Sequence, residues 1–412
     1  MHYREKNIKA TKAEKILSKY AFPIKKKETI NVKDSANRIL AENIVSKFDI
    51  PRFDNAAVDG YAFNIKDVKA NIRKFELVGS SKPGKPYNGK IKPGQAIKIF
   101  TGALILPKFK NIINVVVMKE FCIESDNTVI PSGEFILGQN IRKKGEDIKK
   151  GKIIIKMRRK IRIVDLGFLS SIGLEKVKVF KKLSVGIFST GDEIVTKATG
   201  DLKNKIFDSN MLSLFSMLKR LGCEPKDLGI IKDNYKDSKR SILKSLKICD
   251  ILLTTGGISS SETDQIKRFM LKNGNIKFSK IAIKPGRPFS FATIKNKPLL
   301  GLPGNPVAVI VVFLMFVVNF IRKISGVKNH KINFSLIPSS FEFKKKKNRK
   351  EWIRGSEFQK NGKLFLKKFQ NEGSGILSSI FTTQGIIELD EKTEYIKKGD
   401  LLKFYRYEDI LN

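Results

Sequence analysis

From about residue 183 the hydrophobic and polar positions repeat the order strand, loop, helix three times. Apolar runs at 183–189, 251–255 and 299–302 have the length of buried strands. Each run ends in a loop rich in small or acidic residues, and a segment with helical spacing or a continuous apolar run follows each loop. The pattern predicts an open parallel α/β domain.

The expected helices have recognisable starts. Asp208, Ser209 and Asn210 can cap the first helix, and the second is expected to begin near Asp264. Pro306 suits the first turn of the third helix. The 12 apolar residues of 307–318 are too few to span a bilayer, so we expect this helix to be buried against the sheet.

The flanking regions are predicted to be mainly β. Short strand-like runs at 96–100, 114–118 and 152–156 are separated by Gly and Pro turns. From about residue 328 the chain again shows short alternating segments, which is typical of a small β-barrel or sandwich. The fold class is therefore multidomain α/β, with mainly-β flanking domains and a C-terminal β-barrel.

Residues 51–62, Pro-Arg-Phe-Asp-Asn-Ala-Ala-Val-Asp-Gly-Tyr-Ala, follow neither a helical nor a strand period. We expect an irregular backbone that presents Asp54 and Asp59 from a loop. Carboxylates and an amide on a loop suit a cation or a sugar-like hydroxyl group. A turn in which Asp54 and Asn55 bond their own backbone is the alternative, and the sequence leaves both open.

Composition narrows the possible chemistry. The chain has 412 residues, 41% of them hydrophobic, which suffices for several ordinary cores. Its two histidines, His2 and His330, lie outside any motif, which disfavours a Ser-His-Asp triad and an ordinary catalytic zinc site. Three widely separated cysteines and the absence of an apolar signal core favour a cytoplasmic protein. Carboxylates, Lys, Arg, backbone amides and a hard metal ion must then carry the chemistry.

The formal net charge is +41, from 81 Lys and Arg against 40 Asp and Glu. The excess is spread over almost every segment, whereas nucleic-acid-binding proteins concentrate theirs. We interpret it as compositional bias that places Lys on the surface, with incidental polyanion affinity at low salt. The densest run, 344–347, is expected to be solvated. No specific nucleic acid and no membrane is expected as a partner.

Three loops that follow the predicted strands should lie together. They are residues 190–193, 256–264 and 303–306, and ligands of open α/β sheets bind at this edge. Glycines let backbone amides approach an anion, and the N-termini of the following helices attract it. One such loop is more commonly a glycine turn without a ligand. Three in succession favour a phosphate-bearing ligand.

Eight ordered motifs resemble those of the molybdopterin molybdenumtransferases of the MoeA and gephyrin E-domain type. They are PRFDNAAVDGYA at 51–62, IFTGA at 99–103, GEDIKKG at 145–151, STGDE at 189–193, DSN at 208–210, TTGGISSSETD at 254–264, IKPGRP at 283–288 and GLPGNP at 301–306. The resemblance covers residues 10–405. It implies a molybdopterin-binding type of α/β domain.

The resemblance also implies the reaction and the assembly. Members of this family insert molybdenum from molybdate into adenylylated molybdopterin and release AMP, with Mg²⁺ or a similar divalent cation. The implied assembly is an elongated homodimer of four-domain subunits whose active site is shared between subunits. A molybdopterin adenylyltransferase and acceptor molybdoenzymes are the implied protein partners.

The implied domains are placed by their position in the chain. We assign residues 1–50 together with 140–180 to an elongated linking domain and 51–139 to a mainly-β domain. Residues 181–327 form the α/β domain, and 328–412 form the C-terminal β-barrel domain.

Individual residues receive roles from the same resemblance. The implied catalytic residues are Asp59, Thr101, Asp147, Glu193, Asp233 and Asp264, of which the last three would hold the metal ion and the first three would come from the partner subunit. The implied substrate-binding residues are Asp208, Ser209, Asn210, Gly256, Gly257, Ser259, Lys280, Lys284, Pro303, Gly304, Asn305, Pro306, Arg354 and Ser374. A hard cation held by carboxylates suits the cleavage of a pyrophosphate bond.

The chain departs from the family pattern at a few places. After Ala103 it reads Leu-Ile-Leu-Pro-Lys-Phe-Lys-Asn-Ile-Ile-Asn, where the family has a short loop with Gly-Ala-Asp. Arg287 stands where a Lys is usual, which keeps the charge but changes the hydrogen-bond geometry. Ala308 replaces a Ser, and Asn234 replaces the second Asp of an Asp-Asp pair.

Other functions compete with this reading. A molybdopterin adenylyltransferase shares the Gly-Gly and Gly-Asn-Pro elements, but that family lacks the segment at 51–62 and the C-terminal β domain. A non-catalytic scaffold of the gephyrin type has no need to hold repelling carboxylates together, so the complete acidic set favours an enzyme. Whether the oxyanion is molybdate or tungstate stays open.

Overall fold

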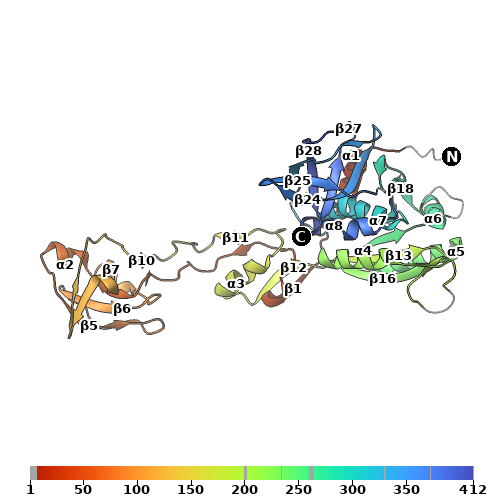
Figure 1. Cartoon of the computed structure of the whole chain (residues 1–412). Coiled ribbons are helices and arrows are strands. Elements are labelled where there is room, and N and C mark those ends of the chain that lie inside the picture. The colour runs from red at the N-terminus through yellow and green to blue at the C-terminus, as the bar shows by residue number, and fades with distance from the viewer. Residues whose placement is uncertain are drawn as a thin grey trace. The chain divides into compact units, whose positions relative to one another are not determined.

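A computed structural model describes residues 7–198, 202–232, 234–258, 264–328, 331–371 and 373–411 (Figure 1). The chain falls into two compact units. Unit 1 consists of Met1–Ala41, Arg158–Gly167 and Glu175–Asn412, and unit 2 consists of Glu42–Met157 and Phe168–Leu174. The finer division into four domains stays a prediction.

Unit 1 is built around a six-stranded sheet with the order β16-β13-β17-β21-β20-β18. These strands are β13 (Ser184–Thr190), β16 (Glu224–Ile231), β17 (Ile251–Thr255), β18 (Asn275–Phe278), β20 (Ser290–Ile294) and β21 (Lys297–Leu302). The first four in spatial order are mutually parallel, whereas β20 pairs antiparallel with both β21 and β18. The expected α/β fold is confirmed, with an antiparallel pair at one edge.

Three helices follow strands of this sheet: α4 (Ser209–Arg220), α5 (Tyr235–Ile248) and α6 (Gln265–Asn273). Asp208 caps α4 as expected, since its carboxylate accepts the backbone N–H groups of Asn210 and Met211. Asp264 occupies the cap position of α6. The strand β16 and the helix α5 were not among the predicted elements. A short parallel pair, β14 (Ile194–Val195) and β15 (Ile206–Phe207), lies between β13 and α4 in the chain.

The apolar segment after β21 forms the centre of the unit 1 core. It is helical over Pro306–Ile324, as α7 (Pro306–Val312), a π-helical turn η4 (Phe313–Val317) and α8 (Val318–Ile324). By length and composition alone these 19 residues could cross a membrane, but 83% of the apolar window is buried inside the protein. The segment is longer than predicted, and its expected burial is confirmed. Such burial is typical of a core helix.

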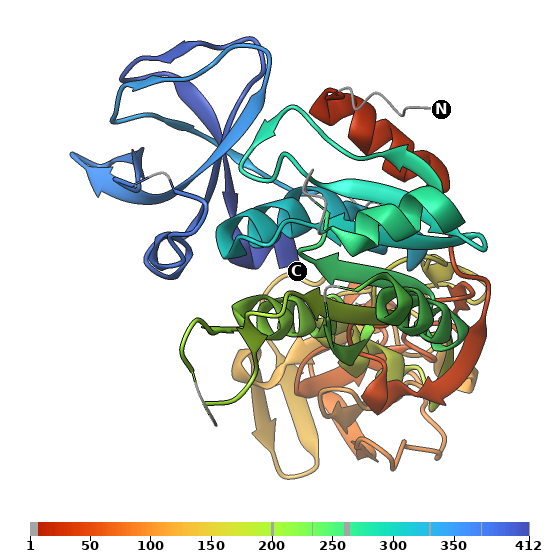
Figure 2. The ribbon, with the colours of Figure 1, turned by 90° about the vertical axis from the view of Figure 1, so that its right-hand side faces the viewer.

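The C-terminal strands pack against the same core. Their main sheet has the order β19-β24-β26-β28-β22, with β25 paired to β24, and Figure 2 places the C-terminal strands beside the α/β part. The elements are β19 (Ile283–Lys284), β22 (Ser335–Pro338), β23 (Phe343–Lys344), β24 (Lys350–Lys360), β25 (Lys363–Lys368), α9 (Ser378–Phe381), β26 (Gly385–Leu389), β27 (Tyr395–Ile396), β28 (Leu401–Arg406) and α10 (Tyr407–Leu411). Trp352 and Tyr405 belong to the core that surrounds the long helix. Because β19 comes from the α/β region, one sheet joins the two regions.

The basic run at 344–347 is only partly solvated, which corrects the expectation. Lys345 is 7% exposed, and its ammonium group donates to the carbonyl oxygens of Lys346, Asp390 and Thr393. Three carbonyl acceptors compensate for the loss of water around a buried cation. This lysine therefore stabilises the turn that joins β26 to β27.

The N-terminal segment also belongs to unit 1. Helix α1 (Ala10–Tyr20) buries Ala10, Ala13 and Leu17 in the core, and β1 (Lys27–Asn31) pairs antiparallel with β12 (Lys176–Phe180). A one-turn helix, η1 (Val32–Asp34), follows β1.

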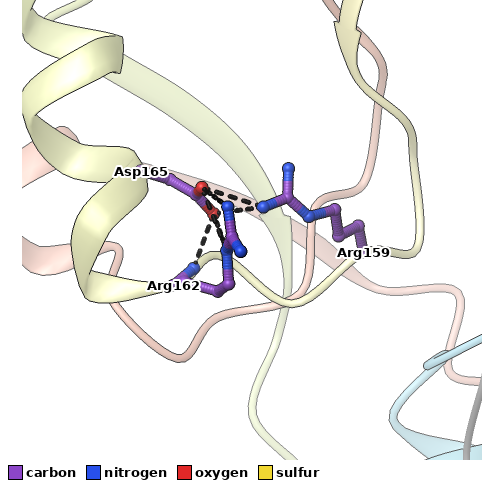
Figure 3. Close-up of polar contacts among 3 residues, drawn as sticks. All are labelled: Arg159, Arg162 and Asp165. Atoms are coloured by element: carbon purple, nitrogen blue, oxygen red, sulfur yellow. Dashed lines mark hydrogen bonds and ion pairs between the residues drawn. The ribbon is translucent and has the colours of Figure 1, made fainter.

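A charged cluster fixes the start of α3 (Ile163–Ser171). Figure 3 shows the carboxylate of Asp165 bonded to both Arg159 and Arg162. This carboxylate is buried, and it lies 2.7 Å from the guanidinium of Arg159 and 2.9 Å from that of Arg162. Burial raises the pKa of Asp165, but the hydrogen bonds from Arg162 and Arg159 outweigh burial and hold the pKa below its ordinary value. Asp165 also accepts the backbone N–H of Arg162, which satisfies one of the open donors at the helix start.

Unit 2 contains a mainly-β sheet with the order β7-β4-β6-β5-β9-β8. Its strands are β4 (Gly60–Phe63), β5 (Phe75–Ser81), β6 (Gln95–Ile99), β7 (Val115–Met118), β8 (Cys122–Ser125) and β9 (Thr128–Pro131). Shorter elements are β2 (Ile44–Val45), β3 (Asn55–Ala56), α2 (Ile65–Lys69), η2 (Pro107–Phe109), η3 (Lys119–Phe121), β10 (Ile141–Arg142) and β11 (Ile153–Ile155). The expectation of mainly-β structure here is confirmed.

The segment 51–62 is more regular than predicted. Asn55 and Ala56 form β3, and β4 begins at Gly60, so only the stretches around Asp54 and Asp59 lie outside strands. Gly60 is required here because a Cβ would lie 1.9 Å from the carbonyl oxygen of Val117 in β7. The close pairing of β4 with β7 therefore excludes any side chain at this position. All four residues of β4 are buried, so no alternation of polar and apolar residues marks this strand in the sequence.

Candidate functional site

Loops at the carboxyl ends of neighbouring strands meet in unit 1, as the sequence predicted. Thr190, at the end of β13, donates its hydroxyl to the carbonyl oxygen of Thr255 at the end of β17, at 3.3 Å. The backbone N–H of Gly256 donates to the carbonyl oxygen of Leu302, at the end of β21, at 3.1 Å. These bonds hold the described parts of the three loops at one edge of the sheet.

Gly256 and Gly257 allow this close approach. Their φ angles are +82° and +67°, in the region that favours glycine. A Cβ on either residue would lie 2.9 Å from the hydroxyl oxygen of Thr190. The glycines therefore serve the packing of the loops, whether or not a ligand is bound.

The segment Asp208–Asn210 lies against the same edge. Asn210 donates its side-chain amide to the carbonyl oxygen of Gly304, at 2.8 Å. Asp208 accepts the hydroxyl of Ser189 and two backbone N–H groups of α4. Both carboxylate oxygens of Asp208 are thus used within the protein. We infer that Asp208 supports the loop, while Asn210 and Ser209 start the helix beside it.

A cavity of about 730 Å³ opens beside the loop that follows β21. Its described lining consists of Ile283, Lys284, Pro285, Gly286, Arg287, Pro288, Pro303, Gly304, Asn305, Ala308, Arg349, Gly373 and Ser374. Three of these side chains are cationic, and none of them is acidic. The cavity can therefore receive an anion, and its size admits more than a single small oxyanion.

Hydrogen bonds from Asn305 and Arg354 hold the lining residues Gly373 and Ser374 in place. Asn305 donates its amide to the hydroxyl oxygen of Ser374, at 2.9 Å. Arg354 is 3% exposed and donates to Ser379 at 2.9 Å and to the carbonyl oxygen of Gly373 at 3.3 Å. Arg354 therefore lies beneath the loop that carries Ser374 and shapes it from inside.

The structure separates some of the predicted substrate-binding residues from the cavity. Lys284, Pro303, Gly304, Asn305 and Ser374 line it, whereas Lys280 does not. Pro306 begins helix α7 directly after the lining residue Asn305. Ser259 lies outside the described residues.

The predicted metal ligands are only partly described. Glu193 lies in the loop after β13 with its carboxylate folded over Gly191, and Asp264 precedes α6. Asp233 lies outside the described residues. Within the described ranges, no group of three His, Cys, Asp or Glu side chains lies close enough to hold a metal ion.

Unit 2 carries the remaining predicted catalytic residues. The hydroxyl and the backbone N–H of Thr101 donate to the same carboxylate oxygen of Asp59, at 2.7 Å and 2.8 Å. These bonds lower the pKa of Asp59 below its ordinary value. Asp147 is exposed and donates its backbone N–H to the carbonyl oxygen of Ile50.

Asp54, the other carboxylate singled out in this segment, has a structural partner. It accepts the backbone N–H of Lys144 at 2.8 Å and lies 3.4 Å from the ammonium group of Lys143. Asn55 donates to the carbonyl oxygen of Phe53. The predicted alternative, in which the side chain bonds the nearby backbone, therefore holds for Asn55. Asp54 instead joins residues 51–62 to the segment that contains Lys143 and Lys144.

The departures from the family pattern have local consequences. Ala308 lines the cavity, so the hydroxyl that the family usually has at this position is missing there. The long segment after Ala103 packs into unit 2, with Ile105, Phe109 and Ile113 in its core. Asn234 caps α5 by accepting the backbone N–H of Asp237.

Sequence reasoning missed Arg349, which lines the cavity, and Glu351, its buried partner. Arg349 lines the cavity, and its Nε donates to the buried carboxylate of Glu351 at 2.7 Å. The available signal was the pattern Arg-x-Glu just before Arg354, which sets a basic and an acidic side chain two residues apart. Nothing in the sequence placed this pair beside Lys284.

Three family descriptions match successive parts of the chain. Residues 8–173 match the MoeA N-terminal region (domain I and II). Residues 186–323 match the probable molybdopterin binding domain, and residues 337–407 match the MoeA C-terminal region (domain IV). Together they account for most of the chain.

Individual relatives agree over nearly the full length. The molybdopterin molybdenumtransferase of Haemophilus influenzae is 32% identical, over 96% of this chain and 98% of that protein. The putative molybdopterin biosynthesis protein of Methanocaldococcus jannaschii is 33% identical, over 97% and 98%. The crystal structure of the molybdopterin biosynthesis MoeA protein from Pyrococcus horikoshii has a TM-score of 0.85 at 28% identity, covering 98% of this chain and all of that one. Motifs, fold and full-length similarity agree, and the chain belongs to the MoeA family of molybdopterin molybdenumtransferases.

Proposed function

We propose that this protein inserts molybdenum from molybdate into adenylylated molybdopterin and releases AMP. Both substrates carry negative charge, on the oxyanion and on the pyrophosphate. The protein must therefore bind two anionic groups side by side. The edge of unit 1 that carries the cavity suits this task.

The cation-lined cavity is the observation that carries the proposal. Lys284, Arg287 and Arg349 surround a space in which the hydroxyl of Ser374 and the backbone of Gly304 are also exposed to a ligand. Cations that share a concave surface bind an anion better than the same charges scattered over a flat face. We assign molybdate to this cavity, with Lys284 in its lining. The predicted role of Lys280 on the molybdate side would then be exerted from outside the lining.

The neighbouring glycine loops suit the phosphate groups. Helix α7 starts at Pro306, so its N-terminus points a positive end toward the cavity edge. Gly256 and Gly257 bring backbone close to the same edge without a side chain in the way. We assign the adenylyl and pyrophosphate part of the substrate to this region, with Ser209, Asn210 and Ser259 beside it.

Carboxylates at the ends of adjacent strands suit a divalent cation. The strands β16, β13 and β17 are neighbours, and Asp233, Glu193 and Asp264 follow them in the chain. Carboxylate oxygens are the ligands that Mg²⁺ prefers, and the ion would neutralise charge on the pyrophosphate. We propose that these three residues hold it. Their side chains would position the phosphate whose bond to AMP is broken.

Unit 2 supplies the remaining residues in this proposal. Asp59 is preorganised by Thr101, and we assign Asp59, Thr101 and Asp147 to the active site of a partner subunit in a homodimer. A two-fold dimer would then hold two equivalent composite sites. We further propose that the protein acts in the cytoplasm, between an adenylyltransferase and acceptor molybdoenzymes.

The test is incubation of the purified protein with adenylylated molybdopterin, molybdate and Mg²⁺, with AMP release as the measurement. The proposal predicts AMP release that requires both molybdate and the divalent cation. Formation of adenylylated molybdopterin from molybdopterin and ATP would instead favour the adenylyltransferase alternative. If the protein catalyses neither reaction, the result would favour a scaffold.

A further inference from the structure

A buried carboxylate joins two of the cavity cations from inside the protein. The side chain of Glu351 in β24 is 1% exposed. Its Oε1 accepts the Nε of Arg349 at 2.7 Å, and its Oε2 lies 3.8 Å from the ammonium group of Lys284. Arg349 and Lys284 line the cavity, whereas Glu351 does not.

The strand pairing fixes this arrangement. The parallel pair β19 and β24 places Lys284 directly opposite Glu351. Directly opposed residues of paired strands share one face of a sheet, so Lys284 and Glu351 lie on the same face. Arg349 lies just before β24, which begins at Lys350, and its hydrogen bond to Glu351 holds it beside that face.

Stability alone does not explain Glu351. Its Oε2 is a buried atom without a hydrogen-bond partner in the described part of the chain. Burying a charged group with an unused acceptor is costly, and a well-packed apolar residue is often at least as stable. A role beyond folding accounts for a carboxylate at this position.

The contacts of Glu351 leave the outer ends of Arg349 and Lys284 available to a ligand. Glu351 holds Arg349 through Nε, and within the described ranges no hydrogen bond occupies the terminal Nη groups of that guanidinium. The side chains of Arg349 and Lys284 are 31% and 39% exposed, so their outer ends reach the cavity. A guanidinium held by its inner nitrogen presents its planar outer edge to an oxyanion.

We propose that Glu351 is a positioning residue, which orients Arg349 and Lys284 toward an oxyanion bound in the cavity. The inference rests on the proposed function, because it assigns a support to the molybdate site. Lys345 lies close enough to Glu351 to be influenced by it. Burial lowers the pKa of Lys345, and the charge of Glu351 opposes this shift. Glu351 thus balances cations that would otherwise repel each other.

The decisive variant is Glu351→Gln, which keeps the size of the side chain and one acceptor oxygen but removes the charge. The ion pair with Arg349 becomes a weaker hydrogen bond from a cation to a neutral acceptor, so we expect the KM for molybdate to rise about tenfold, with kcat within about threefold of the wild-type value. Direct titration of molybdate into the protein should show the same loss of affinity.

A matched control lies on the neighbouring strand. Glu388 in β26 is also buried and pairs with Lys350 and Lys403, at 3.5 Å and 3.3 Å. It accepts the indole N–H of Trp352, the residue next to Glu351, so it lies on the opposite face of the sheet. Glu388→Gln should lower thermal stability and leave the KM for molybdate unchanged.

A double-mutant cycle separates positioning from a general loss of fold. If Glu351 acts through Arg349, the combined variant with Arg349→Met should raise the KM by less than the product of the two single effects. Multiplicative effects, or an unchanged KM in Glu351→Gln, would overturn the inference.

A wild-type protein that binds no molybdate on titration would also overturn it. If the wild-type protein binds molybdate but releases no AMP, the proposed function fails, while titration of the variant still decides the role of Glu351.

Discussion

The two units hold their predicted catalytic and binding side chains in different ways. In unit 1 the key groups have support from buried partners: Arg354 lies beneath the cavity wall, and Glu351 joins two cations. In unit 2 Asp59 lies at the surface, and its carboxylate is fixed by the hydroxyl and N–H of one neighbour, Thr101. The first arrangement is buried, whereas the second is a local contact between the segments just before β4 and just after β6.

This difference indicates a division of tasks. Unit 1 offers cations and glycine loops, which bind and orient anions. Unit 2 offers an ionised carboxylate whose pKa is lowered mainly by the two hydrogen bonds from Thr101, with a smaller contribution from the charge of Lys119. Substitutions in unit 1 should therefore affect binding and metal dependence, and those at Asp59 should affect turnover with little change in the fold.

The largest effect is expected for the acidic residues of unit 1. Asp264→Asn or Glu193→Gln should reduce AMP release by at least about 100-fold, because each removes a negative charge from the proposed cation site. Thermal stability should stay near that of the wild type, since Glu193 is exposed and Asp264 lies at a helix start. Asp227→Asn, which changes an exposed carboxylate in β16, is the matched control. Wild-type turnover with unaltered Mg²⁺ dependence would remove both residues from the metal site.

The next prediction tests whether the two units act across subunits. Asp59→Ala and Asp264→Ala proteins should each be inactive, whereas mixing them under conditions of subunit exchange should restore activity. Each heterodimer would hold one intact site and one doubly damaged site, so we expect about half of the wild-type activity per heterodimer.

Subunit exchange must be verified in the same experiment, for example by mass measurement with differently tagged subunits. Self-mixing of each variant is the control and should restore nothing. If heterodimers form and stay inactive, Asp59 and Asp264 act within one subunit. One subunit would then supply both residues of a site, and the proposal that a partner subunit supplies Asp59 would be wrong.

Sequence patterns predicted the fold best where both faces of a strand are buried. Strand β17 spans Ile251–Thr255, the bounds that the apolar run predicted, and all five of its residues are buried. Strand β16 was missed because its residues Glu224–Ile231 combine a proline, charged side chains and exposed positions. The apolar core of a central strand is visible in the sequence, whereas an edge strand depends on its neighbours.

The site was predictable to the extent that its residues follow strands of one sheet. The edge that carries Gly256, Asn305 and Asn210 followed from this rule and from the motifs. The contact of Glu351 with Lys284 depends on the pairing of β19 with β24, two segments far apart in the chain. Register between distant strands is set by tertiary packing, so no local pattern could reveal it.

The smallest effect is expected for the contact between Thr101 and Asp59 in unit 2. Thr101→Val removes one hydrogen bond to Asp59 and keeps the backbone N–H, so kcat/KM should fall about fivefold, the equivalent of about 1 kcal/mol. The pKa of Asp59 is lowered by the hydroxyl and N–H of Thr101, so losing the hydroxyl should raise it toward its ordinary value. Ionised Asp59 would then be lost earlier as the pH falls, and the acid limb of the activity profile should move to higher pH. Thr128→Val, which removes a hydroxyl bonded to the carbonyl oxygen of Ser125 in the same unit, should leave the profile unchanged. An acid limb that does not move in Thr101→Val would show that ionisation of Asp59 does not limit the reaction, and unit 2 would then contribute shape and not charge.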